Sequence, residues 1–197
     1  MIQLPLPLIL ASGSPRRKEL LSILNLPFKV VVSDSDESFE PTLPPIEVPG
    51  ILAERKALTV QKIQPQSVII AADTVVDLEG KILNKPLHLP EAREMLHSLS
   101  GKMHYVHKAY SIVTPTSVLT RTDTAKVHFK SLTSYEIDWY LKEGKPLDKA
   151  GAYGIQEWIG LIAVDKLEGS YFTVMGLPTH LLWQDLVDLA QKEPGSH

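Results

Sequence analysis

Residues 67–76, SVIIAADTVV, decide the fold because they form the most strand-like run of the chain. β-Branched and small apolar residues stand on both sides of Asp73, and such residues favour strands. The Glu79-Gly80 pair that follows predicts a tight turn into a short partner strand at residues 81–83. The first inference is therefore an apolar strand that carries a carboxylate.

Strand and helix signals alternate on both sides of this segment, as is typical of an α/β or α+β sheet protein. Ser14 is a good N-cap, and Pro15 suits the first position of the helix that follows it. Thr133 and Glu136 form a capping box for a later helix that ends at Gly144. The other expected elements are strands at 6–11, 28–32, 105–113, 118–129, 161–164 and 171–174 and helices at 51–63, 90–99 and 178–190.

Length and composition limit the function classes. The 197 residues are expected to form a single domain, 1–197, and the chain has no cysteine, which excludes disulfides and thiolate chemistry. A net charge of −3 with no basic tail argues against binding a nucleic acid polymer. The N-terminal apolar run is short and broken by Pro5 and Pro7, so we expect neither a signal peptide nor a membrane anchor. A cytoplasmic protein is the expectation.

The segment 12–17, SGSPRR, joins a predicted strand to a predicted helix. The start of a helix offers unpaired N–H groups and the positive end of its dipole, and both suit a phosphate. The hydroxyls of Ser12 and Ser14 and the guanidiniums of Arg16 and Arg17 add further donors. An ordinary capped helix with solvated arginines is the alternative.

Asp73 is the second candidate, because a carboxylate in an apolar strand is unfavourable unless it is paired or binds a metal. Ligands of open α/β sheets gather at strand ends, which suits a general base or a metal ligand. A turn aspartate placed wrongly in the strand is the alternative.

Weaker signals come from an acidic pair, two lysines and a glycine-rich segment. Asp36 and Glu37 precede a proline-rich loop and offer oxygen ligands for Mg²⁺ or Mn²⁺, although a solvated acidic loop is commoner. Lys56 and Lys85 are unremarkable by themselves. In DKAGAYGIQ, residues 148–156, the small residues permit close contact with a flat ligand. The final residue of the segment, Gln156, could contact the edge of a base. A plain connecting loop is the alternative.

Taken together, these segments resemble the Maf family of nucleotide pyrophosphatases. The matching stretches occur in order and cover most of the chain: LILASGSPRRKELL, the 36–37 acidic pair, 53–57, AADTVV, GKILNKP, LSGK-x-H, DKAGAYGIQ and EGSYFTVMGLP. The resemblance implies an α/β fold with a mixed, twisted sheet, flanking helices and an elongated cleft, similar to inosine triphosphatases. It also implies hydrolysis of a nucleoside triphosphate to the monophosphate and pyrophosphate, a divalent metal (Mg, Mn or Co), and a homodimer.

The resemblance also implies residue roles. Asp73 is implied to be the general base and a metal ligand, and Glu37 is implied to be a metal ligand or a residue that positions the water. Three residues are implied to select dTTP and UTP. One of them is a glutamine, which can both donate to and accept from a uracil or thymine edge. The three residues are Arg16, Thr74 and Gln156. The implied phosphate contacts are Ser12, Ser14, Arg17, Lys56 and Lys85.

Two departures from the family pattern concern the charge of the cleft. Lys108 stands where a threonine is usual, and Glu54-Arg55 reverses the usual order. Two other functions remain open: the same chemistry on other or modified nucleotides such as 7-methyl-GTP, and a non-catalytic nucleotide-binding regulator of cell division, such as septum formation.

Overall fold

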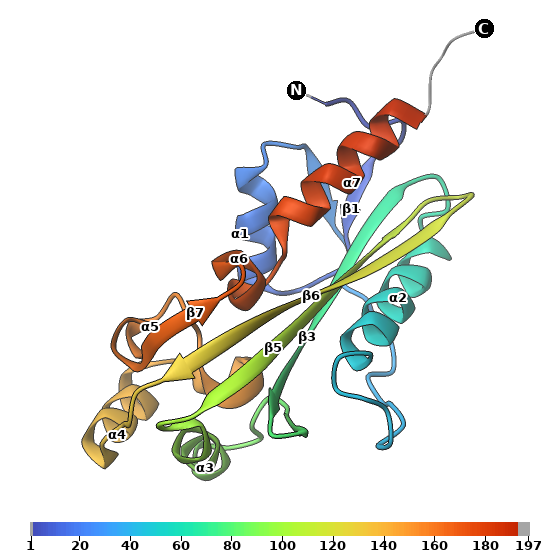
Figure 1. The fold of residues 1–197 in the computed structure, drawn as a ribbon. Coiled ribbons are helices and arrows are strands. Elements are labelled where there is room, and N and C mark those ends of the chain that lie inside the picture. The colour runs from blue at the N-terminus through green and yellow to red at the C-terminus, as the bar shows by residue number, and fades with distance from the viewer. Residues whose placement is uncertain (1, 193–197) are drawn as a thin grey trace, which may run out of the picture.

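The computed structural model describes residues 2–192, whose strands form one mixed sheet (Figure 1). The sheet has seven strands in the order β2-β1-β3-β5-β6-β7, and β4 pairs with β3 beside this path. The strands are β1 Leu8–Leu10, β2 Phe28–Val30, β3 Val68–Leu78, β4 Lys81–Leu83, β5 Met103–Val113, β6 Val118–Phe129 and β7 Val164–Glu168.

Helices flank this sheet, as the sequence predicts. The capping box of Thr133 and Glu136 is present at the start of α4, and Ser14 is the N-cap of α1. No helix within residues 2–192 has the length and apolar character needed to cross a membrane. The helices are α1 Pro15–Ile23, α2 Val48–Gln61, α3 Leu89–Leu99, α4 Ser134–Glu143, α5 Trp158–Ala163, α6 Tyr171–Met175 and α7 Thr179–Lys192, with two short 3₁₀ turns, η1 Pro146–Asp148 and η2 Ala150–Ala152.

One edge of β3 opens in its middle. β5 pairs with residues 69–77 along one edge of β3, so the parallel strand β1 and the antiparallel strand β4 share the other edge. β1 pairs with residues 68–70 and β4 with residues 76–78. In the described part of the chain, residues 71–75 therefore have no strand partner on that edge, and side chains from both faces of the sheet meet there.

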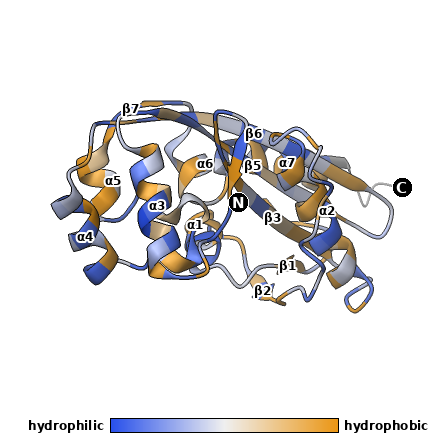
Figure 2. Ribbon diagram, turned by 90° about the horizontal axis from the view of Figure 1, so that it is seen from below, coloured by the Kyte–Doolittle hydropathy of each residue, from blue (hydrophilic) through white to orange (hydrophobic). Residues whose placement is uncertain are grey.

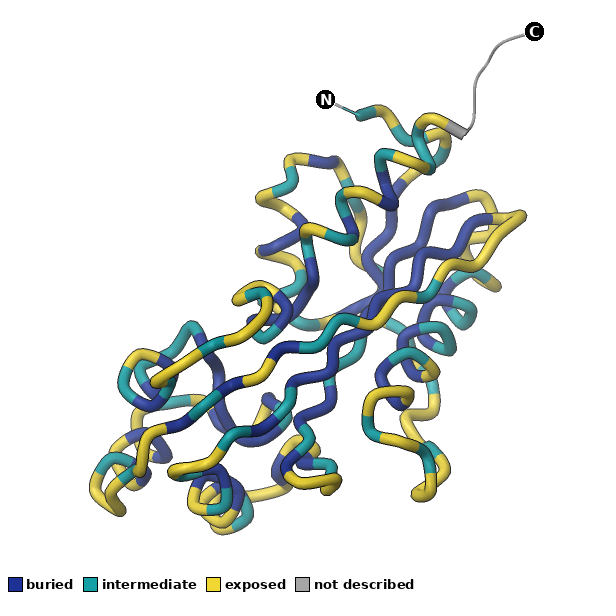
Figure 3. Tube along the Cα trace, in the orientation of Figure 1, coloured by how far each residue is buried: buried dark blue, intermediate teal, exposed yellow. Residues whose placement is uncertain are grey.

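Successive residues of β3 point to opposite faces of the sheet, as strand geometry requires. Ile69 and Ala71 pack with Ala57 and Val60 of α2 in a small apolar cluster. Ile70 belongs to the larger cluster on the other face, which includes residues of α1, α3, α4, α5 and α7. Figure 2 shows apolar residues on the strands and on the helix faces beside them. Figure 3 shows that the middle of the sheet is buried, whereas the tip of the β5–β6 hairpin is exposed.

Two predicted strands are wrong. Residues 171–174 form α6, a one-turn helix whose Thr173 is buried and donates to Asp123 of β6 at 2.5 Å. Residues 161–163 are the end of α5, and the strand begins only at Val164. β-Branched residues in both places, and aromatic residues at 171–172, favour a strand, but a short apolar run cannot be distinguished from a buried helical turn by periodicity.

Candidate active site

A cleft of about 550 Å³ lies where the edge of β3 opens between β1 and β4. The start of α1 and the 148–156 segment both line it. Asp36 of the acidic pair does not line this cleft, but every residue to which the resemblance assigns a role does. These residues are Ser12, Ser14, Arg16, Arg17, Glu37, Lys56, Asp73, Thr74, Lys85 and Gln156.

The β1–α1 junction carries a set of donors directed at the cleft. Ser14 is the N-cap of α1, yet its side chain makes no capping hydrogen bond. Its N–H donates to Ser12 Oγ at 3.2 Å, and Arg17 Nη1 donates to the same oxygen at 3.0 Å. Arg17 Nε is buried without a partner in the described residues, and burial lowers the pKa of this guanidinium while Asp73 opposes the shift. A helix start with a buried guanidinium suits a phosphate.

Asp73 and Glu37 share one lysine. Lys56 Nζ lies 2.5 Å from Asp73 Oδ1 and 2.8 Å from Glu37 Oε1. The side chains of Lys56 and Asp73 are only 11% and 14% exposed, whereas that of Glu37 is 57% exposed. α2 supplies the lysine and β3 the aspartate, because Asp73 points to the face of the sheet that α2 covers. A partly buried carboxylate is thus held in one orientation at the edge of the cleft.

Each residue of the reversed Glu54-Arg55 pair before Lys56 makes a specific contact. Arg55 Nη1 donates to the carbonyl oxygens of Asp36 and Ser38 at 2.8 and 2.7 Å, which fastens the acidic loop to α2. Glu54 accepts a hydrogen bond from Thr120 Oγ1 of β6 at 2.9 Å. The arginine therefore holds the backbone around Glu37 in place.

The opposite face of β3 presents a different group of polar side chains. Thr74 points away from α2, and its Oγ1 accepts a hydrogen bond from Lys108 Nζ of β5. Gln156 Oε1 is buried and has no partner in the described residues. Arg16 binds Asp148, with Nη1 3.1 Å from Oδ2, and both residues line the cleft. The predicted specificity residues thus lie apart from the Asp73–Lys56 pair.

Three site features escaped sequence reasoning. Asp148, which lay inside the DKAGAYGIQ segment, binds Arg16, and neighbouring Lys149 is buried between Asp148 at 2.5 Å and Glu157 at 2.8 Å. Although burial raises the pKa of Asp148, the bond from Lys149 and the charges of Lys149 and Arg16 lower it overall. The third is the contact of Lys108, which the sequence indicates only as a departure from the family pattern, with Thr74; only strand register shows that the two are neighbours.

The chain is similar to known proteins over most of its length. A protein from Thermus thermophilus named dTTP/UTP pyrophosphatase is 46% identical over 181 residues, which cover 90% of this chain and 94% of that protein. A protein of the same name from Halalkalibacterium halodurans is 50% identical over 172 residues, or 87% and 90% of the two chains. One from Phocaeicola vulgatus is 44% identical over 184 residues, or 92% and 95%. Residues 7–189 match the family described as Maf-like protein, and the chain belongs to that family.

Proposed function

We propose that the protein hydrolyses dTTP and UTP to the monophosphate and pyrophosphate. The observation that carries the proposal is the position of Asp73. Its carboxylate lies at the cleft that is also lined by the β1–α1 junction, whose hydrogen-bond donors suit a phosphate. Relatives that share 44–50% of their residues with this chain are named for this activity.

In the proposed reaction, Asp73 takes a proton from a water molecule as that water attacks the α-phosphorus. The bond from the α-phosphorus to the bridging oxygen breaks, and pyrophosphate leaves with the electron pair. Lys56 contacts Asp73 Oδ1 in the structure, and its ammonium would bind a phosphate oxygen during the reaction. Ser12, Ser14 and Arg17 would hold the phosphates from the start of α1, and Lys85 would reach them from the exposed loop after β4.

Glu37 and Asp73 fit a divalent cation that is shared with the substrate. Their oxygens converge on one point, which the ammonium of Lys56 occupies in this structure. Hard divalent ions such as Mg²⁺ bind one or two carboxylates together with phosphate oxygens, so two protein ligands are sufficient. When bound, a cation there would neutralise charge that develops on the phosphates. Lys56 would then move its ammonium to a phosphate oxygen.

Arg16, Thr74 and Gln156 would select the base from the other side of β3. The unpartnered buried oxygen of Gln156 offers an acceptor for the N3–H of uracil or thymine. Arg16 and Thr74 supply donors for the carbonyl oxygens that flank it. A guanine edge presents a different donor pattern, so 7-methyl-GTP is the weaker candidate substrate.

Pyrophosphate release from a panel of nucleoside triphosphates tests the proposal. We expect turnover of dTTP and UTP above that of dCTP, GTP and 7-methyl-GTP when Mg²⁺, Mn²⁺ or Co²⁺ is present. Release from none of them by the folded protein, together with nucleotide binding, would support the non-catalytic regulator instead. The homodimer and the cytoplasmic location stay predictions.

A further inference from the structure

Lys108 is a buried lysine whose partner at the cleft is a hydroxyl group. The residue is fully buried in the middle of β5, and it lines the cleft. Nζ donates to Thr74 Oγ1, and no carboxylate lies within ion-pair distance of it in the described part of the chain. Burial lowers the pKa of Lys108 well below its ordinary value, and nearby Arg17 adds to this shift. Burying a lysine without an acidic partner is unfavourable, so this arrangement calls for a functional explanation.

The direction of the lysine is itself informative. Lys108 has Thr74 of β3 as its register partner on one side and Asp123 of β6 on the other. Asp123 instead accepts a hydrogen bond from Thr173 of α6. The lysine is thus aimed at the neutral partner that faces the cleft, although an acidic residue stands beside it on the neighbouring strand.

This contact decides how the Thr74 hydroxyl behaves. A hydroxyl has one hydrogen to donate, and a donor that already occupies one of its lone pairs turns that hydrogen away from itself. Thr74 Oγ1 makes no other hydrogen bond within residues 2–192, and the residue is partly exposed to the cleft. Hydrogen bonds in a chain polarise one another, so the hydroxyl becomes a stronger donor and a weaker acceptor. An amine has two N–H donors and an ammonium three, so the contact does not depend on the charge of Lys108.

We propose that Lys108 is a positioning residue for base selection, because it makes the Thr74 hydroxyl a hydrogen-bond donor for a carbonyl oxygen of the base. The corresponding substrate class is pyrimidine nucleotides with oxygen at C4, and pyrimidines with an amino group there are disfavoured. This inference rests on the proposed function. It adds a residue outside the set Arg16, Thr74 and Gln156, and it explains what the buried lysine does.

The test compares UTP with CTP, which differ in the group at C4. We expect Lys108→Met, which keeps the apolar stem and removes the donor, to lower the ratio of kcat/KM for UTP to that for CTP by about tenfold, the factor that corresponds to ~1.4 kcal/mol. The lower ratio should come mainly from a lower kcat/KM for UTP. Lys108→Gln, which restores an N–H donor, should recover part of the ratio. Lys126→Met is the matched control, since Lys126 is exposed on β6 and does not line the cleft.

A double-mutant cycle separates this role from a merely structural one. Thr74→Val removes the hydroxyl, and adding Lys108→Met to it should leave the UTP/CTP ratio where Thr74→Val alone sets it. Equal losses on UTP and CTP, as a general phosphate contact would cause, or additive effects in the double variant, would overturn the proposal. If the wild-type protein hydrolysed no nucleotide, the proposed function would fail. The base-selection inference would then be tested independently by the calorimetric affinities of UMP and CMP.

Discussion

Replacing Asp73 with asparagine should abolish most turnover while leaving the fold nearly intact. Removal of a general base typically slows a reaction ~10²–10⁴-fold, which corresponds to about 3–5.5 kcal/mol of barrier. An asparagine oxygen can still accept the hydrogen bond from Lys56. That lysine also keeps Glu37, 2.8 Å away, as its ionic partner. The folded state is therefore not left with an unpaired buried cation.

The expected loss of stability is correspondingly small. The change weakens one charge-assisted hydrogen bond and removes no packing, so about 1 kcal/mol is a reasonable estimate. For a domain of this size such a change lowers Tm by roughly 2–4 °C. The loss of activity should thus exceed any effect that partial unfolding at the assay temperature could produce.

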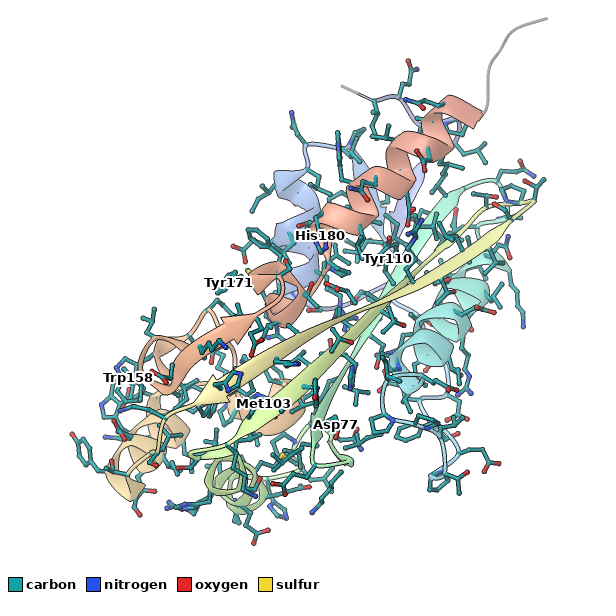
Figure 4. All side chains as sticks on the ribbon, in the orientation of Figure 1. Asp77, Met103, Tyr110, Trp158, Tyr171 and His180 are labelled. Carbon is teal, nitrogen blue, oxygen red and sulfur yellow. The ribbon has the colours of Figure 1, made fainter. Side chains whose placement is uncertain are left out.

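The assay is pyrophosphate release from UTP with a divalent metal, with Tm measured on the same samples. Asp77→Asn is the matched control, because it makes the same change on the same strand and the same face. Asp77 lies at the end of β3 that leads to the β3–β4 turn and does not line the cleft (Figure 4). The control should retain nearly normal turnover. A folded Asp73→Asn protein with turnover close to wild type would refute the assignment of Asp73 as the base.

Three further outcomes are expected. In calorimetric titrations, Arg17→Ala should weaken the binding free energy of every triphosphate by a similar amount, about 1.5–3 kcal/mol; a loss confined to triphosphates with one base would make Arg17 a specificity residue. Gln156→Glu should lower kcat/KM for dTTP and UTP about 5- to 150-fold more than for dCTP or GTP, because a carboxylate keeps the acceptor for N3–H but places negative charge beside the carbonyl oxygens of the base, to which it cannot donate; equal losses on all would leave only a structural role. His104 has its pKa lowered from 6.5 to about 3 by burial, so only the unfolded chain takes up this proton as pH falls below 6.5. The free energy of unfolding should therefore drop by roughly 2 kcal/mol between pH 6.5 and 5 on account of this group, and His104→Phe should remove that part of the denaturant-measured slope.

Local sequence patterns predicted most of the secondary structure because the signals themselves are local. The strand around Asp73 and the helix capped by Thr133 follow from neighbouring residues alone, and the structure contains both. Residues 171–174 are predicted as a strand because aromatic and β-branched residues favour strands locally, and the contact of Thr173 with Asp123, 50 positions away, does not appear in that local signal. Distant packing also shapes the core, where Tyr110 of β5 donates to Asp185 of α7 (Figure 4).

The candidate site was predictable as a set of residues but not as an arrangement. Order and spacing along the chain were enough to indicate two features. These are the strand–helix junction at residues 12–17, which suits a phosphate, and Asp73, the candidate general base. The contacts of Lys56, Arg16 and Lys108 were not predictable in this way, since strand register and helix placement determine which of these side chains meet.

Sequence by itself determined the class of fold, the family and the residue types available for phosphate and base contacts, because these depend on local propensity and on motifs that adjoin one another in the chain. Tertiary structure alone decided that β1 and β4 leave the middle of β3 open, so that side chains from both faces reach one cleft. It also decided that Asp73 turns toward α2 and Thr74 toward Lys108. The physical reason is strand geometry: adjacent residues point to opposite faces, and only long-range pairing determines what each face meets.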